Sequence, residues 1–362
     1  MRLTFFLLFI YIMANGQDQL FPQYVDTELQ EHLVASYKPY DLLSYSTTRD
    51  TMYRHVFSNK EGNVTCYYTG HSIFLPDDVD PSSYLYNDAD YNGITTEHIY
   101  PQSKGAGSGD ARRDMHNLVP SIWRVNEARS NYSFGEVPDT ETDNWYAYTE
   151  DLSDMPSENI DLYSERLKAR SGNPGRFEPR ESVQGDVARA IFYFYTMYKE
   201  EADDADPNFF HDMKEVLYMW HLQDPVDSLE QVRNLLKAKY QQGKPNPFIL
   251  DCSLVRRAYF SDRDIDSNCA NAANTTTVVH ESDASPDIIV YPNPFTDRIY
   301  LKTLGVRQKV SYSINTIDGR KLLQGEVNSD KQIDLAHMQS GFYLLMLTDH
   351  KGNTVVHKIC KQ

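Results

Sequence analysis

Two adjacent residues, Glu97 and His98, place a carboxylate beside an imidazole, and Asn126 adds a side-chain amide on a later segment. An imidazole is suited to take a proton from water near neutral pH. A carboxylate and an amide offer the oxygen atoms that a hard divalent cation prefers. Hydrolysis of a phosphodiester needs such a base, such a cation and stabilisation of the leaving oxygen. The three residues can meet the first two needs if their segments fold together.

The sequence around these residues predicts the elements that would position them. Residues 93–99 are expected to form a short strand that ends in Glu97 and His98, followed by a glycine-rich loop at 104–110. A second short strand is expected around 116–119, and a helix is expected to begin at Pro120 and Ser121 and to continue through Arg129. A cation bound where this helix crosses the first strand would have few protein ligands. Most of its octahedral shell would be left to water and phosphate.

Three motifs occur in order along this stretch, namely EHIYP at 97–101, DMHNLVP at 114–120 and VNEARSNYSF at 125–134. With these motifs the chain resembles the bacterial endonuclease I family of the ββα-metal, or His-Me finger, nucleases. Further matching segments lie at 177–198, 220–234 and 246–249. The resemblance covers residues 24–250, and the agreement of several ordered motifs is more specific than any one of them.

The resemblance implies an endonuclease that hydrolyses phosphodiester bonds of DNA without sequence preference, and it leaves open whether RNA is also a substrate. By position, His98 becomes the general base that activates water. Glu97 and Asn126 become the ligands of Mg²⁺, with Ca²⁺ or Mn²⁺ as alternatives. Which side of the phosphate is cleaved stays open.

The family also uses an arginine, on a loop after the Glu-His pair, to steady the leaving phosphate. That loop is shorter here, and Lys104, Arg112 and Arg113 are the candidates. We favour Arg112, because lysine cannot make the bidentate contact with phosphate that arginine makes. Arg129 is expected to form a structural salt bridge instead. His116, between Met115 and Leu118, is expected to be an inner histidine that braces the fold.

The charge balance argues against a general nucleic-acid binder, because such proteins gain affinity when lysine and arginine release counterions from phosphate. The whole chain has a formal net charge of −17. Residues 97–131 differ from this average, since they contain five basic and four acidic residues. The acidic remainder predicts weak binding of nucleic acid without a metal, and solubility outside the cell.

Residues 1–16 have the features of a secretory signal peptide, with an early arginine, an apolar run from Leu3 to Met13 and small or polar residues after it. That run is too short for a permanent anchor, so no stable membrane span is expected. Four cysteines follow, and none of them forms a CxxC pair. Four cysteines can form two disulfides in three different ways, and the sequence leaves the choice open. Cys252 and Cys269 are the pair nearest in sequence.

Residues 17–268 are expected to form the catalytic domain, which is predicted to be mostly helical. Good periodicity predicts helices at 186–200 and 228–240, and the aromatic run within the first is expected to be core. The polar composition of 134–181 predicts long surface loops. Residues 269–285, rich in Asn, Ala, Thr, Ser and Asp, are typical of an exposed linker.

Residues 286–362 predict a small all-β sandwich, because short alternating runs are separated there by turn signals. The strands are expected at 288–291, 298–302, 310–314, 321–323, 342–348 and 354–359. The segments VYPNPFTDRIYL, IDGR and SGFYLLMLTDHKG resemble the C-terminal sorting domain of the type IX secretion system. This resemblance implies that the protein contacts the secretion machinery and is exported through the outer membrane. It leaves open whether the protein is then released or held at the cell surface.

The predicted fold class is therefore α+β, with a ββα-metal finger in a mostly helical catalytic domain and a β-sandwich after it. A monomer is expected. Two other functions are weighed against the nuclease. A zinc hydrolase would use His98, His116 and a carboxylate, but the chain has no HExxH motif and Asn126 would then have no role. A non-catalytic protein displayed on the surface would have no need of a general base.

Overall fold

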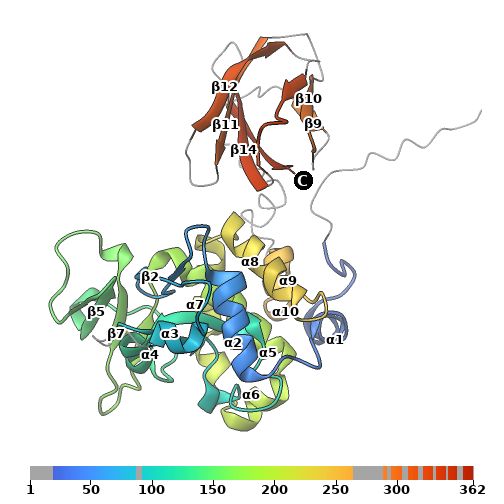
Figure 1. Ribbon diagram of the computed structural model, residues 1–362. Coiled ribbons are helices and arrows are strands. Elements are labelled where there is room, and N and C mark those ends of the chain that lie inside the picture. The colour runs from blue at the N-terminus through green and yellow to red at the C-terminus, as the bar shows by residue number, and fades with distance from the viewer. Residues whose placement is uncertain are drawn as a thin grey trace, which may run out of the picture. The chain divides into compact units, whose positions relative to one another are not determined.

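The computed structural model describes residues 19–86, 92–263, 288–291, 295–303, 309–316, 321–328, 332–339, 341–348 and 354–361. The chain divides into two compact units, residues 1–270 and residues 271–362 (Figure 1). The predicted signal peptide at 1–16 and the predicted linker at 269–285 lie outside the described residues. Among the described helices, none is both long enough and apolar enough to cross a membrane.

The first unit is built around helix α5 (Gln184–Met197), in which every residue except Asp186 is buried. Helix α5 packs against α1 (Asp26–Tyr37), α6 (Lys199–Ala205), α7 (Phe209–Gln223) and α9 (Pro247–Leu250). The other described α-helices of this unit are α2 (Tyr45–Met52), α3 (Pro81–Tyr86), α4 (Trp123–Arg129), α8 (Ser228–Lys239) and α10 (Ser253–Tyr259). The helix predicted at 186–200 is confirmed, although it begins two residues earlier and ends at Met197, before α6. The helix predicted at 228–240 is confirmed as α8, and the aromatic run of α5 is core, as predicted.

An antiparallel hairpin of β3 (Ile94–His98) and β4 (Leu118–Ile122) leads directly into α4. The second strand is thus shifted from the predicted 116–119, and the helix begins at Trp123 rather than at Pro120. His116 lies in a 3₁₀ turn before the strand. Proline is compatible with this two-stranded ribbon, because only alternate N–H groups of a strand point toward its partner.

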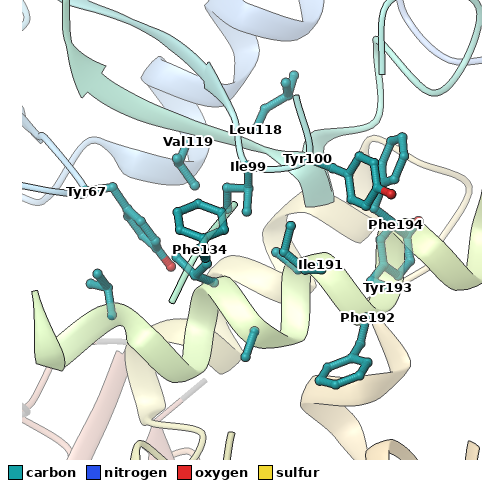
Figure 2. Packing of buried hydrophobic residues seen from close by; sticks show 14 of the residues in the cluster. Tyr67, Ile99, Tyr100, Leu118, Val119, Phe134, Ile191, Phe192, Tyr193 and Phe194 are labelled. Carbon is teal, nitrogen blue, oxygen red and sulfur yellow. The ribbon is translucent and has the colours of Figure 1, made fainter. Parts of the chain in front are cut away.

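The hairpin packs on α5 through apolar side chains (Figure 2). Ile99 and Tyr100 follow β3, and with Val119 of β4 they belong to the same buried cluster as the α5 side chains. The Tyr100 ring stacks on Phe194 of α5, with 4.3 Å between the ring centroids. Since α5 is itself buried, the end of β3 rests on the least mobile part of this unit.

A four-stranded antiparallel sheet occupies part of the segment predicted to be surface loops at 134–181, so that prediction is wrong. Its strands are β5 (Asn144–Ala147), β6 (Glu150–Leu152), β7 (Ser164–Leu167) and β8 (Arg176–Glu178), in the order β6-β5-β7-β8. Trp145 and Phe177 are fully buried and anchor the sheet. Strands of three or four residues are too short to show a period in a polar sequence. A further ribbon joins β1 (Asn63–Thr65) to β2 (Ser72–Phe74).

The second unit consists of two antiparallel sheets that contribute to one buried cluster. One sheet has the order β13-β10-β9 and the other β12-β11-β14-β15. The strands are β9 (Ile288–Tyr291), β10 (Arg298–Thr303), β11 (Lys309–Thr316), β12 (Lys321–Asn328), β13 (Gln332–Asp334), β14 (Gly341–Thr348) and β15 (Thr354–Lys361). The six predicted strands are confirmed in position, while β13 was missed and β12 is longer than predicted.

Cys66 is buried and free, and its sulfur accepts a hydrogen bond from the Ile122 N–H at 3.2 Å. A full pairing of all four cysteines is therefore excluded. Cys252 is disulfide-bonded. The pairing with Cys269 considered from the sequence lies outside the described residues.

Two carboxylates, Glu165 and Glu178, face each other across β7 and β8. Burial is the largest cause that raises both pKa values, to about 7 for Glu165 and about 8 for Glu178. The charge of Glu136 raises both further. Like charges at directly opposite positions of a sheet are destabilising.

Stability is therefore expected to fall as pH rises from about 5 to about 8, because the folded chain keeps protons there that the unfolded chain has released. Glu178→Gln removes the titration and keeps one of the two oxygens that accept hydrogen bonds, from the Val137 N–H and from the Gln184 amide. We expect it to raise the unfolding temperature by a few degrees at pH 8.5 and to leave it unchanged near pH 5. Thermal unfolding followed by circular dichroism measures this, with exposed Glu158→Gln as control. An equal shift at both pH values would contradict the explanation.

Candidate active site

An open pocket of about 380 Å³ lies beside the end of β3, and Glu97, His98 and Asn126 all line it. Glu97 and His98 are the last two residues of β3, and Asn126 lies in the middle of α4. The chain turns from β4 directly into α4, which packs back on β3. This local path brings the three predicted site residues together.

Glu97 is a buried carboxylate with only 3% of its surface exposed. Its Oε1 accepts a hydrogen bond from the Tyr68 hydroxyl at 2.8 Å and lies 3.2 Å from Nε of Arg129. Burial raises the pKa of Glu97, and the charge of Arg129 and the Tyr68 hydroxyl partly oppose that shift. Both side-chain contacts are to Oε1. The second oxygen, Oε2, has no side-chain partner among the described residues.

The His98 ring is fixed by a contact of 3.1 Å between Nε2 and the backbone carbonyl of Arg112. A carbonyl can only accept, so Nε2 has the proton and Nδ1 keeps a lone pair when the ring is neutral. Burial lowers the pKa of His98 to about 4, and the nearby charges of Arg112 and Arg129 add to the effect. The imidazole is therefore neutral near pH 7, which is the state that a general base requires.

The Asn126 amide is oriented by its nitrogen, which donates to Thr95 Oγ1 at 3.0 Å and to the Thr96 carbonyl at 3.2 Å. Because that carbonyl can only accept, the assignment of the amide nitrogen and oxygen is fixed. The amide oxygen accepts no hydrogen bond from any residue that the structure describes. It is the kind of oxygen atom that a hard cation binds.

Three residues of the DMHNLVP motif brace the chain around the pocket. Asn117 is fully buried, and its amide pairs with both the N–H (2.7 Å) and the carbonyl (3.0 Å) of Tyr100. Asp114 is also fully buried. It accepts hydrogen bonds from the hydroxyls of Tyr193 in α5 and Tyr198 directly after α5, from the Gln241 amide and from a backbone N–H. His116 is buried with Nε2 2.9 Å from the Lys244 carbonyl, so its predicted bracing role is confirmed.

The three basic candidates for the phosphate contact have different surroundings. Lys104 forms an ion pair with Asp206 at 2.7 Å, and Arg113 forms one with Asp110 at 2.5 Å. The Arg112 guanidinium lies over the Tyr45 ring, 4.3 Å from its centroid. It has no ion pair among the described residues, and its buried Nε has no hydrogen-bond partner.

Arg129 forms the structural salt bridge that the sequence predicted, with Glu97. It also donates to the carbonyls of Ile99 (2.6 Å) and Ser130 (3.0 Å), so its guanidinium joins the end of β3 to the end of α4. With none of its side-chain surface exposed, Arg129 is held in place by these contacts.

Two residues at the site were not found from the sequence. Tyr68 holds Glu97 from 29 positions away, and Tyr45 stacks on His98 with 5.7 Å between the ring centroids. Nothing in the sequence separates them from the other tyrosines, of which the chain has 26 in all. Only a pairing of distant segments could have identified them.

The donor set fits a divalent cation that is bound by few protein groups. Glu97 and Asn126 present a carboxylate oxygen and an amide oxygen to the same open pocket, which leaves room for water and phosphate as further ligands. The described residues contain no group of three or more His, Cys, Asp or Glu side chains arranged to hold a metal. A zinc site made of His98 and His116 is not formed, because His116 is bound to a carbonyl and does not line the pocket.

Comparison with known families matches residues 23–252 to Endonuclease I and residues 289–362 to a secretion system C-terminal sorting domain. The Endonuclease I match includes every element that lines the pocket. The sorting domain assigns the protein to the cell exterior or the cell surface. Nucleases of the Endonuclease I family generally depend on a divalent metal.

Several relatives with established names are extracellular nucleases. An extracellular ribonuclease of Bacillus subtilis (strain 168) is 33% identical over 168 residues, which cover 42% of this chain and 49% of that protein. An extracellular ribonuclease of Bacillus amyloliquefaciens is 32% identical over 42% of this chain and 49% of its own length. An extracellular deoxyribonuclease of Aeromonas hydrophila is 32% identical over 38% and 48%, respectively. The chain thus spans about half the length of the curated relatives that it matches.

Removal of the Tyr68 hydroxyl tests how Glu97 is held. Tyr68→Phe keeps the buried ring and deletes one of two side-chain contacts to Oε1. Partners that orient a metal ligand typically contribute 10- to 100-fold in metal affinity. We expect Tyr68→Phe to weaken Mg²⁺ or Mn²⁺ binding by about 10-fold, measured by calorimetry on the protein without nucleic acid.

Tyr198→Phe is the matched control, because it also removes a buried tyrosine hydroxyl from a carboxylate, that of Asp114. It is expected to lower the unfolding temperature without changing metal affinity. Equal metal affinities in wild type and Tyr68→Phe would refute the role of this hydroxyl.

Proposed function

The chain belongs to the Endonuclease I family, and from this membership we propose that it is a metal-dependent endonuclease that hydrolyses phosphodiester bonds of DNA, and of RNA as well, without sequence preference. One observation carries the proposal, namely that His98, Glu97 and Asn126 line one open pocket. The names of the relatives, which include both ribonucleases and deoxyribonucleases, support the choice of substrates.

In this proposal His98 removes a proton from the attacking water at Nδ1, because Nε2 already donates to the Arg112 carbonyl. The same carbonyl keeps the ring in position and stabilises the imidazolium that forms. Glu97 and Asn126 would hold Mg²⁺, with Ca²⁺ or Mn²⁺ as alternatives. The bound cation supplies positive charge to the developing phosphorane and the leaving oxygen. Tyr68 and Arg129 orient the Glu97 carboxylate and favour its ionised form against the effect of burial.

Arg112 is proposed to contact the phosphate during the reaction. Its guanidinium has no carboxylate partner among the described residues, whereas Lys104 and Arg113 are neutralised by Asp206 and Asp110. A planar guanidinium can bind two phosphate oxygens at once.

The finer structural assignments also belong to this proposal. We assign β3, β4 and α4 to the ββα-metal finger, and the two sheets of the second unit to a β-sandwich that serves the secretion machinery. The proposed domain limits are 1–16 for the signal peptide, 17–268 for the nuclease, 269–285 for the linker and 286–362 for the sorting domain.

His98→Ala is expected to lower the rate of plasmid hydrolysis by 10²-fold or more, which is the range of general base catalysis. Binding of metal and nucleic acid should persist. The measurement is a digestion assay on DNA and on RNA, with magnesium and again with EDTA, which should stop the wild-type enzyme. His211→Ala, at an exposed position on α7, is the control. Intact DNA and RNA after incubation of the wild-type protein with magnesium, manganese and calcium would end the proposal.

Arg112→Gln is expected to reduce kcat on the order of 10²-fold, as is typical when one donor to a developing charge is lost. Arg112→Lys should recover only part of the loss, because it restores the charge without the two-pronged contact. Arg113→Gln and Lys104→Gln serve as controls and should stay within a few-fold of wild type. If Arg113→Gln were the more damaging change, the phosphate contact would belong to that residue.

A further inference from the structure

A second arginine contacts the tyrosine ring that stacks on the general base, although it lies well before the catalytic motifs in the sequence. Arg49 of α2 lies over the Tyr45 ring, with its guanidinium carbon 5.4 Å from the ring centroid. Arg112 lies over the same ring at 4.3 Å. Tyr45 in turn stacks on His98. The two guanidinium carbons are therefore at most about 10 Å apart, and both lie over the ring that stacks on His98.

Among the described residues no carboxylate contacts either arginine directly, and the exposed Asp80 interacts with Arg49 only through its charge. In the part of the chain that the structure describes, neither guanidinium has an ion pair, whereas Arg54, Arg113 and Arg129 nearby each have one. Arg49 donates a hydrogen bond from Nε to the Ser82 hydroxyl at 3.3 Å and makes another with the Tyr45 hydroxyl, and both of these partners are neutral. In a chain with a net charge of −17, two half-buried arginines that share one tyrosine ring and form no ion pair with any described residue are an unusual local arrangement. Their charges would be balanced by an anion from outside the protein.

We propose that Arg49 and Arg112 form a phosphate-binding subsite that holds the nucleic-acid backbone next to the scissile phosphate. This inference rests on the proposed nuclease function and adds a substrate contact to it. Phosphates on one strand of a duplex advance by about 3.4 Å along the axis, so the span of the two arginines covers neighbouring phosphates of one strand. The Tyr45 ring holds both guanidinium groups through cation–π contacts, which limits the conformational freedom lost on binding.

The subsite also explains how an acidic protein could hold a polyanion without a broad basic surface. Contacts to phosphate position a nucleic acid without reading its sequence. Two arginines on the ring that stacks on His98 would therefore fix the register of the bound strand without reading its sequence, in agreement with a nuclease that has no sequence preference.

The alternative is that Arg49 only supports Tyr45, and through it the His98 ring. The two roles differ in what they change. A phosphate contact sets the salt dependence of binding, because each contact releases counterions and contributes about 0.9 to the slope of log Kd against log salt on duplex DNA. A supporting role would lower kcat and leave that slope unchanged.

The test is Arg49→Gln in the full chain. Binding of a fluorescent DNA duplex is measured by anisotropy over a range of KCl concentrations, with EDTA present to prevent cleavage. We expect the slope to fall by about 0.9 relative to wild type. In steady-state assays with magnesium, KM for DNA should rise several-fold while kcat stays within about twofold. Arg256→Gln, at a half-buried position on α10, is the control and should leave both slope and KM unchanged.

An unchanged slope overturns the proposal, whether or not kcat falls. Should Arg49→Gln not give the wild-type circular dichroism spectrum, Arg49→Met keeps the apolar contact with Tyr45, and the same slope decides. A wild-type protein that neither binds nor cuts DNA would refute the proposed function itself. A wild-type enzyme that does both, with Arg49→Gln indistinguishable from it, would refute only the subsite.

Discussion

The buried charge of Glu97 is the constraint that organises the pocket. A carboxylate removed from water is costly unless a counter-charge and hydrogen bonds replace the solvent. Arg129 and Tyr68 supply them, and Arg129 also binds the carbonyls of Ile99 and Ser130. One guanidinium therefore holds the end of β3, the end of α4 and the carboxylate together. The relative position of the strand and the helix follows from neutralising this group.

A second buried carboxylate, that of Asp114, fixes the position of the loop between β3 and β4. It accepts hydrogen bonds from two tyrosine hydroxyls, from the Gln241 amide and from the backbone of its own loop. The loop is thereby tied to α5, the most buried helix of the unit. Arg112 lies two residues before Asp114, so its carbonyl is held where it can orient the His98 ring. Polar groups that are fully satisfied in this way make a rigid support.

The fold could be predicted from the sequence where a pattern is long. The helices α5 and α8 have enough turns to show their period, and the strands of the second unit are separated by clear turn residues. The sequence predicts loops where the sheet of β5 to β8 lies, because its strands are short and polar residues surround the buried Trp145 and Phe177. Hairpin boundaries shifted by a few residues for a similar reason, since Pro120 reads as a helix start and lies in a strand.

The sequence by itself determined the family and the sorting domain. It also singled out Glu97, His98 and Asn126 as the candidate site, because these lie in short motifs whose residue types are tied to one chemistry. The tertiary structure alone decided what surrounds them. Tyr68 and Tyr45 reach the site from distant segments, and the pairing of Arg113 with Asp110 and the lack of a partner for Arg112 depend on side-chain directions. Burial, ion pairing and ring stacking are properties of three-dimensional neighbourhoods, and residue order does not encode them locally.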